Sequence, residues 1–243
     1  MTLCGGRDDS NHQSPATIYY LSAMRALILS DIHGSADAAR KALSYFERFD
    51  CHRIFLLGDT LYHGPRNPLP EGHGPMGVVE ALRPYAGKIV AARGNCDADV
   101  DLMMLDFIEI QDEYALVVDK VTDSAGKERS IRLFLSHGHI FMPECFPANA
   151  LAQLEPTFEM ARTPEELAQG EQPQNDRLID AYLYGHTHIY QLQKNFKDVL
   201  LVNPGSTSLP KGGNLPTFGL YDSGKFSIHH LETGEIQAST TLL

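Results

Sequence analysis

The chain has 243 residues, which is enough for one large domain or two small ones with a well-buried core. Its 31 acidic residues outnumber its 20 basic residues and give a formal net charge of −11, which argues against a general nucleic-acid binder and against attraction to an anionic membrane. An anionic substrate would therefore need a local source of positive charge, and a bound metal ion is the obvious candidate.

Three features of the sequence indicate the cellular location of the protein. The four cysteines are widely spaced and form no CxxC pair, which indicates neither a zinc knuckle nor a disulfide framework and favours reduced thiols. No apolar run is long enough to span a membrane, and the first 15 residues lack the basic start and apolar core of a signal peptide. We therefore expect a cytoplasmic protein, with residues 1–23 as a polar N-terminal extension and Met24 as an alternative start.

In the first half of the chain, short apolar runs alternate with helical patterns. Strands are expected at 26–30, 53–57 and 88–92, and helices at 35–49 and 78–85. Ser35 is the expected N-cap of the first helix, in which apolar residues recur on one face from Ala39 to Phe46.

In the second half, strands follow one another. A hairpin is expected from the apolar runs 114–119 and 131–136, and a further strand at 180–184, with two short helical patterns between them. We see no internal repeat and no linker, so residues 24–243 are expected to form a single domain with inserts near 121–130 and 151–176. The pattern predicts an α/β fold in which two sheets pack face to face with helices outside.

Side chains that can bind a metal follow five of the expected strands, at the point where each strand ends. In chain order they are Asp31-Ile32-His33, Gly58-Asp59, Gly94-Asn95, His137 and Gly185-His186-Thr187-His188. Because open α/β sheets bind ligands at this edge, we expect these side chains to meet there.

The types and spacing of these side chains favour a particular kind of metal centre. Two carboxylates, one amide and four imidazoles suit Mn, Fe, Zn or Ni better than Ca or Mg, and seven ligands suit two adjacent ions. We interpret the HxH spacing as an extended segment, on which residues i and i+2 point to the same side. A lone His is more often a core or surface residue, but the ordered set makes the metal interpretation the stronger one.

Taken together, the motifs resemble those of the calcineurin-like metallophosphoesterase superfamily over roughly residues 24–243. SDIHGS, LLGDTLYHGPRN, RGNCD, SHGH, YGHTH and NPGSTSLPKGGN are most similar to the YfcE-type bacterial phosphodiesterases. The resemblance implies a four-layer αββα sandwich of two mixed sheets flanked by helices. It also implies the ligand set: one ion is held by Asp31, His33 and His188, the other by Asn95, His137 and His186, and Asp59 bridges them.

The activity implied by the resemblance is hydrolysis of a small phosphodiester by a metal-bridging hydroxide at a dinuclear centre, with Mn as the expected metal. Two divalent ions and the two carboxylates leave the site positive, so it can attract an anion. A phosphomonoesterase with the same site stays open. A non-catalytic scaffold is disfavoured because all seven ligand positions are filled, and nucleic acid is disfavoured by the net charge. Self-association as a dimer or tetramer also stays open.

Cys96 stands where the family usually has a His that helps to protonate the leaving oxygen. A thiol with a pKa near ~8.5 is mostly neutral at pH 7 and a weak donor. We interpret Cys96 as a small apolar filler. The alternatives are a weak acid in catalysis together with Asp59 and Asn95, or a third-shell neighbour of the metal. Because a general acid is worth about 10²–10⁴-fold, the sequence predicts a preference for leaving groups that need little protonation, such as aryl groups.

A second departure from the family lies in the loop after Asp59. Many family phosphatases have GDxxDRG there, with the Arg on the substrate phosphate, whereas this chain has GDTLYHGPRN. His63 occupies the Arg position and is predicted to bind phosphate or to donate a proton. Arg66 and Asn67 from the same loop, and His139, are further candidates for substrate binding, although the loop residues could serve only its own turns.

Overall fold

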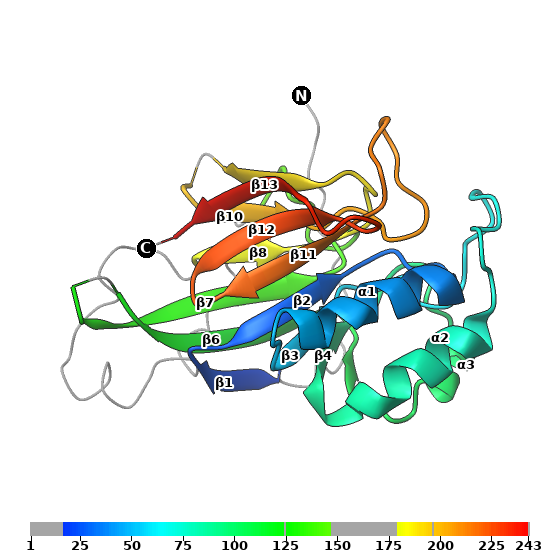
Figure 1. Cartoon of the computed structure of the whole chain (residues 1–243), viewed down its shortest axis with the longest axis horizontal. Helices are drawn as coiled ribbons and strands as arrows, with labels where there is room; N and C mark the ends of the chain where they lie inside the picture. Colours follow the sequence, from blue (N-terminus) through cyan, green and yellow to red (C-terminus); the bar gives the residue numbers. More distant parts are fainter. Residues whose placement is uncertain (1–16, 124, 147–178, 196, 243) are drawn as a thin grey trace, which may run out of the picture.

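Short apolar strands form two mixed β-sheets in the computed structural model, which describes residues 17–123, 125–146, 179–195 and 197–242 (Figure 1). Within these residues the seven-stranded sheet contains, in spatial order, β13 (Ile236–Thr241), β12 (Lys225–His230), β11 (Thr217–Asp222), β2 (Arg25–Leu29), β3 (Arg53–Leu56), β4 (Ile89–Ala92) and β5 (Ile110–Gln111). The six-stranded sheet contains β1 (Ile18–Ser22), β6 (Tyr114–Thr122), β7 (Glu128–Ser136), β8 (Ala181–Leu183), β10 (Leu200–Asn203) and β9 (Gln191–Lys194).

The parallel strands of each sheet place their carboxyl ends together. In the seven-stranded sheet β2, β3 and β4 pair in parallel, and in the six-stranded sheet β7 pairs in parallel with β8. These are the five strands that precede the predicted ligands. Figure 1 shows the loop after β3 in cyan and the loop after β10 in orange, both projecting from the side toward which β2 points.

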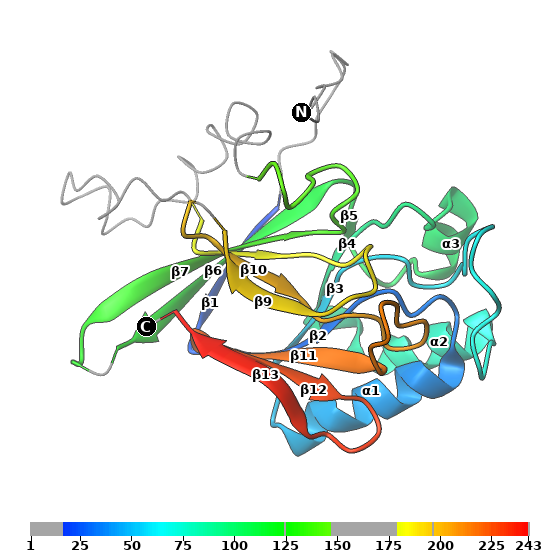
Figure 2. The ribbon, with the colours of Figure 1, turned by 90° about the horizontal axis from the view of Figure 1, so that it is seen from above.

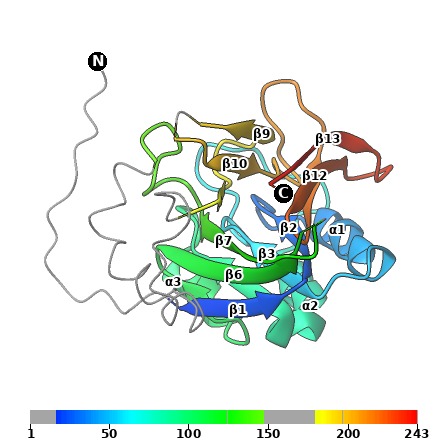
Figure 3. The ribbon, with the colours of Figure 1, turned by 90° about the vertical axis from the view of Figure 1, so that its left-hand side faces the viewer.

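The two sheets pack face to face, and helices cover the outer face of the seven-stranded sheet (Figures 2 and 3). The helical elements are α1 (Ala36–Arg48), α2 (Pro75–Leu82), the 3₁₀ helix η1 (Arg83–Lys88) and α3 (Asp99–Met104). Ser35 caps α1, since its hydroxyl accepts a hydrogen bond from the Ala38 N–H at 3.2 Å, as the sequence predicts.

Successive side chains along a strand point to opposite faces of its sheet, so they enter different hydrophobic cores. In β2, Leu27 packs against the helices in one buried cluster, while Ile28 belongs to the cluster between the two sheets. A third cluster, which includes Phe134 and Tyr182, covers the outer face of the six-stranded sheet. The α/β class with two mixed sheets is therefore confirmed. The helices expected at 151–176 lie outside the described residues.

Three features differ from the sequence-based expectation or refine it. The predicted hairpin is present as β6 and β7, with Asp119 opposite Ile131. Residues 18–22, which we placed in the polar extension, form β1 and pair in parallel with β6, while the domain boundary at residue 24 stays a prediction. Cys51 and Cys96 are free thiols, but Cys145 is disulfide-bonded, so the expectation of reduced thiols is wrong for Cys145. Within the described residues, no helix combines the length and apolar character of a membrane span.

A buried hydrogen bond joins the two sheets through their interior. Tyr221 of β11 donates its hydroxyl to Oδ2 of Asp119 in β6 at 2.7 Å, and both residues are buried. Burial raises the pKa of the Asp119 carboxyl, and the donors around it oppose that effect. The sheets are thus held together by a polar contact inside an apolar layer.

We expect Tyr221→Phe to lower the free energy of unfolding by about 1–3 kcal/mol, because the buried carboxyl of Asp119 loses a donor and gains none. Urea unfolding of the variant beside the wild type measures this loss. Tyr85→Phe is the matched control, since within the described part of the chain no hydrogen bond is made by its hydroxyl. Equal stability of Tyr221→Phe and Tyr85→Phe would contradict the expectation.

Candidate metal centre

Most of the predicted ligands lie just beyond a strand end, on backbone that turns sharply. Positive φ angles occur at Asp31 (52°), His33 (50°), Asp59 (53°), His186 (66°) and His188 (60°). A non-glycine residue in this left-handed region costs on the order of 1–3 kcal/mol and persists only where its surroundings fix it. The interpretation of HxH as an extended segment is therefore wrong, because both histidines are left-handed and lie in a loop after β8.

The first group of side chains consists of Asp31, His33 and His188, whose ligand atoms all lie within 4.8 Å of one another. The Nε2 atoms of the two histidines are 3.2 Å apart. Oδ1 of Asp31 lies 3.7 Å from Nε2 of His33 and 3.4 Å from Nε2 of His188. All three residues are buried.

The second group consists of Asp59, Asn95, His137 and His186. Nε2 of His137 lies 3.4 Å from Oδ2 of Asp59 and 3.0 Å from Oδ1 of Asn95. Oδ1 of Asn95 also lies 2.7 Å from Nδ1 of His186. Oδ2 of Asp59 is 3.7 Å from Nε2 of His33, so Asp59 stands between the two groups. The structure thus brings all the predicted ligands into one cluster.

The imidazole tautomers follow from backbone contacts. Nδ1 lies 2.8 Å from the Tyr62 carbonyl oxygen in His33, 2.7 Å from the Leu57 carbonyl in His137 and 2.6 Å from the Leu209 carbonyl in His188. A carbonyl oxygen only accepts hydrogen bonds, so each Nδ1 carries a proton and each ring turns Nε2, the nitrogen that can bind a metal, toward the cluster. This is the arrangement by which second ring nitrogens orient metal-binding histidines.

The side chains of the first group present acceptors to one another and are suited to binding a cation. The lone pairs of His33 and His188 face each other, and Oδ1 of Asp31 is buried with no hydrogen-bond partner among the described residues. Its other oxygen, Oδ2, accepts from the Ser30 hydroxyl at 2.7 Å and from the His186 N–H at 3.0 Å. Buried acceptors that converge without a donor are costly unless a positive charge lies between them.

The electrostatics of the second group point the same way. Burial lowers the pKa of His137, but the Asp59 carboxylate outweighs it and raises that pKa to about 9. Burial would raise the pKa of the Asp59 carboxyl, yet hydrogen bonding and charge from His137 hold it well below its usual range. These two side chains therefore favour a positive charge in the space between them.

Asp97 is a supporting residue that the sequence reasoning missed. Its buried carboxylate accepts backbone hydrogen bonds from Asp59 (2.9 Å), Thr60 (2.8 Å) and Gly94 (2.7 Å). It thereby joins the loop after β3 to the loop after β4, although burial raises the pKa of its carboxyl. A Cβ on Gly94 would overlap the Asp59 backbone and carboxylate, which explains the glycine. In the sequence, the position of Asp97 in the RGNCD motif was the feature that could have indicated this role.

Asp31 is supported in the same way from the other side of the cluster. The Ser206 hydroxyl donates to the Asp31 carbonyl at 2.7 Å, and the Ser208 hydroxyl donates to the Ile32 carbonyl at 2.8 Å. Both serines come from the NPGSTS stretch after β10, whose role the sequence reasoning did not assign. The chain segment from Asp31 to His33 is therefore fixed by the six-stranded sheet as well as by its own.

Cys96 lies beside the cluster, because its Sγ is within 4.8 Å of ligand atoms of His33 and Asp59. Its backbone N–H donates to Oδ1 of Asp59 at 2.8 Å, and the Asn95 amide lies 3.3 Å from Sγ. Burial and then the Asp59 carboxylate raise the pKa of the thiol to about 12. The thiol is thus a neutral, weak donor at pH 7.

Three of the four candidates for substrate binding, those other than His63, fall in different environments. The His139 ring is 5.4 Å from the His137 ring, and its Nδ1 is buried with no partner among the described residues. Burial and then the neighbouring histidines lower the pKa of His139 to about 4. Arg66 is exposed, and the Asn67 amide donates to the His63 carbonyl at 2.8 Å, so Asn67 braces the loop.

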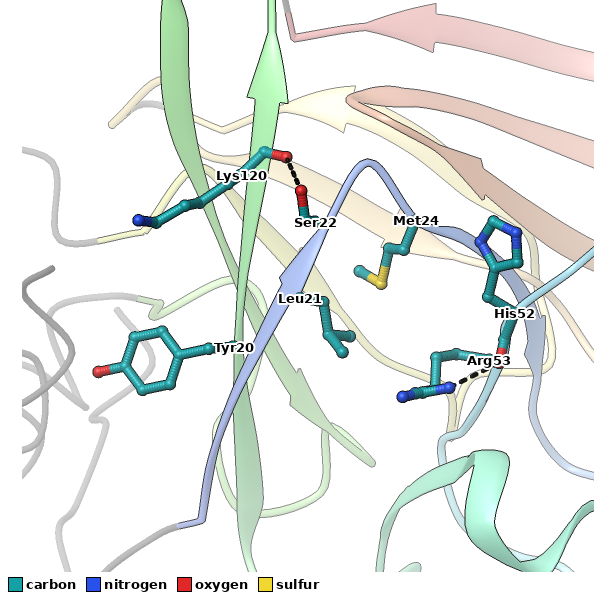
Figure 4. Close-up of a pocket in the computed structure, with 7 residues that line it drawn as sticks. All are labelled: Tyr20, Leu21, Ser22, Met24, His52, Arg53 and Lys120. Carbon is teal, nitrogen blue, oxygen red and sulfur yellow. Dashed lines mark hydrogen bonds between the residues drawn. The ribbon is translucent and has the colours of Figure 1, made fainter.

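A separate surface pocket lies at the opposite ends of the strands (Figure 4). It is lined by Tyr20, Leu21, Ser22, Met24, His52, Arg53 and Lys120. Met24 and Arg53 stand at the amino-terminal ends of β2 and β3, whereas the predicted ligands follow the carboxyl ends. This pocket is therefore not part of the metal cluster.

Comparisons with known proteins bear on the whole chain. The model of the calcineurin-like phosphoesterase superfamily domain matches residues 24–225. Phosphodiesterase YfcE of Escherichia coli is 36% identical over 219 residues, which cover 90% of this chain and 98% of that protein. The solved structure of YfcE, described as a phosphoesterase from E. coli, matches with a TM-score of 0.70 and 35% identity, covering 90% of this chain and all of that one.

We expect Asp97→Ala to lower the free energy of unfolding by about 1–3 kcal/mol, since three buried N–H groups lose their acceptor. The same change should weaken Mn²⁺ binding about 10–100-fold, because the backbone that carries Asp59 and Asn95 is no longer fixed. Urea unfolding and calorimetric Mn²⁺ titration measure the two effects. Asp106→Ala removes an exposed carboxylate as a control, and unchanged Mn²⁺ affinity in Asp97→Ala would overturn the expectation.

Proposed function

We propose, because this chain belongs to the calcineurin-like phosphoesterase superfamily, that it is a phosphodiesterase which hydrolyses small phosphodiesters with two divalent metal ions. The observation that carries the proposal is the convergence of buried carboxylate oxygens and imidazole nitrogens, with Oδ1 of Asp31 left without a hydrogen-bond partner among the described residues. Two ions bound there would activate a water molecule for attack and stabilise the charge that develops on the phosphoryl group.

The two groups divide the ligands between two ions. Asp31, His33 and His188 would hold the first ion, and Asn95, His137 and His186 the second, with Asp59 shared. The mixture of nitrogen and oxygen donors favours Mn²⁺, with Ni²⁺, Fe or Zn²⁺ as alternatives. Because the ions would contribute four positive charges against two carboxylates, the centre would attract an anionic ester despite the net charge of −11.

The protein's own residues would bind and orient the ester. His139 borders the second group, and Arg66 lies exposed on the loop after β3. We propose that both contact phosphoryl oxygens of the bound ester. The diester preference rests on the 36% identity to Phosphodiesterase YfcE. A phosphomonoesterase with the same site is the second candidate. We further propose that the enzyme works in the cytoplasm on a small soluble substrate.

Reloading the metal-stripped protein with Mn²⁺ or Ni²⁺ should restore hydrolysis of an aryl phosphodiester, and Asp59→Ala should abolish it, because Asp59 stands between both groups. The assay compares bis(p-nitrophenyl) phosphate with p-nitrophenyl phosphate for Mn²⁺, Ni²⁺, Zn²⁺ and Mg²⁺. Preference for the monoester would move the assignment to a phosphomonoesterase. Bound ions without hydrolysis of either ester would favour a non-catalytic scaffold.

Mn²⁺ should also stabilise the folded chain, since the cluster is assembled only in the folded state. At a free concentration 100 times the dissociation constant, the gain is about 2.7 kcal/mol for one site, measured as a rise in melting temperature. Asp31→Asn should reduce this rise, because the orphaned buried oxygen loses its charge. Addition of EDTA is the control, and an equal rise in Asp31→Asn would count against the assigned first site.

A further inference from the structure

The loop between β3 and α2 is fastened to the metal centre at both ends. Near its start, Nδ1 of His33 lies 2.8 Å from the Tyr62 carbonyl oxygen. Near its end, the Ala36 N–H donates to the Gly72 carbonyl at 2.9 Å, just after the first ligand group. The loop is therefore held in one place relative to His33, as a catalytic side chain would require.

His63 sits between two contacts with the centre. The residue before it, Tyr62, meets His33 through its carbonyl. The residue after it, Gly64, packs against Cys96, since a Cβ on Gly64 would lie 2.9 Å from the Cys96 Sγ. Gly64 has a φ of +80°, which a residue with a side chain adopts only under strain. The backbone of His63 is thus pinned beside the ligands.

The ring of His63 is not used to hold the fold together. Its Nδ1 is buried and has no hydrogen-bond partner among the described residues. Its ring lies edge-on to the Tyr62 ring at 4.9 Å and to the His73 ring at 5.7 Å, which fixes its position without occupying its nitrogens. In His33, by contrast, Nδ1 is held by a carbonyl oxygen, as suits a metal ligand.

We propose that His63 is the proton donor to the leaving group, an inference that rests on the proposed phosphodiester hydrolysis. Water supplies the new oxygen on phosphorus and releases a proton to solvent. The phosphorus–oxygen bond to the leaving group breaks with its electron pair on that oxygen. His63, as imidazolium, transfers its proton to the same oxygen, and solvent then reprotonates the neutral imidazole.

This loop can approach position 96 because the side chain of Cys96 is small. A bulkier residue at position 96 would extend from the Sγ position toward Gly64 and push aside the backbone that carries His63. On this proposal, an imidazole on the loop takes the part that an imidazole at position 96 would otherwise have. Cys96 thus fills space, and the chemistry that its position might have supplied comes from His63.

The test compares methyl phenyl phosphate with methyl p-nitrophenyl phosphate, which differ only in how much protonation the leaving group needs. With Mn²⁺ bound, His63→Ala should lower kcat/KM for the phenyl ester by about 10²–10⁴-fold and that for the nitrophenyl ester far less. Cys96→His added to His63→Ala should restore the phenyl ester activity, whereas Cys96→Ser in the same background should not. His52→Ala, in the surface pocket at the opposite ends of the strands, is the control and should match the wild type.

Two further measurements distinguish a donor from a ligand or a structural residue. Metal content by atomic emission and the affinity for inorganic phosphate by calorimetry should be unchanged in His63→Ala and His63→Gln. Equal losses for both esters, lost metal, or weakened phosphate binding would overturn the proposal. If the wild type hydrolyses neither ester, the proposed function fails. If the wild type is active and His63→Ala keeps the same ratio between the esters, only the present inference fails.

Discussion

The centre depends on one buried carboxylate that accepts three backbone hydrogen bonds. Asp97 receives the amides of Asp59, Thr60 and Gly94, and so ties the end of β3 to the end of β4. Each of these amides is buried, so leaving it without an acceptor would destabilise the folded protein. The bond network therefore fixes the left-handed turn at Asp59 and, with it, the direction of the carboxylate that stands between the two ligand groups. Metal binding here therefore depends on the backbone conformation that Asp97 fixes as well as on the ligand side chains.

The seven-stranded sheet contributes four of the predicted ligands and the six-stranded sheet three, and loops from one sheet stabilise ligands of the other. The hydroxyl of Ser206, from the six-stranded sheet, supports the carbonyl of Asp31 in the seven-stranded sheet. The Leu57 carbonyl, after β3, orients His137, which follows β7. Because these contacts cross the sandwich, the ligand geometry forms only when the two sheets are packed together. The apolar layer between the sheets is thus part of the energetics of the site.

The sequence predicts the parts of this arrangement that depend on local pattern. Strand periodicity and polar residues at strand ends located the residues that cluster, since carboxyl ends of parallel strands share an edge. β1 escaped prediction because a short strand that is half exposed has a weak pattern and exists by pairing with β6. The conformation of HxH was mistaken because left-handed φ angles carry no signature in His itself. The role of Asp97 was missed because two of its three amide partners, Asp59 and Thr60, are far away in the sequence. The placement of the His63 loop likewise depends on the distant His33.

The contact between Gly64 and Cys96 has a consequence for how this protein can change over time. The two positions share a single small volume, so a larger side chain at either one is accommodated only if the other side gives way. Their effects on stability are then coupled rather than additive. A larger residue at position 96 would therefore have to be matched by a shift of the loop backbone at Gly64, so substitutions at position 96 and in this loop would arise together rather than independently.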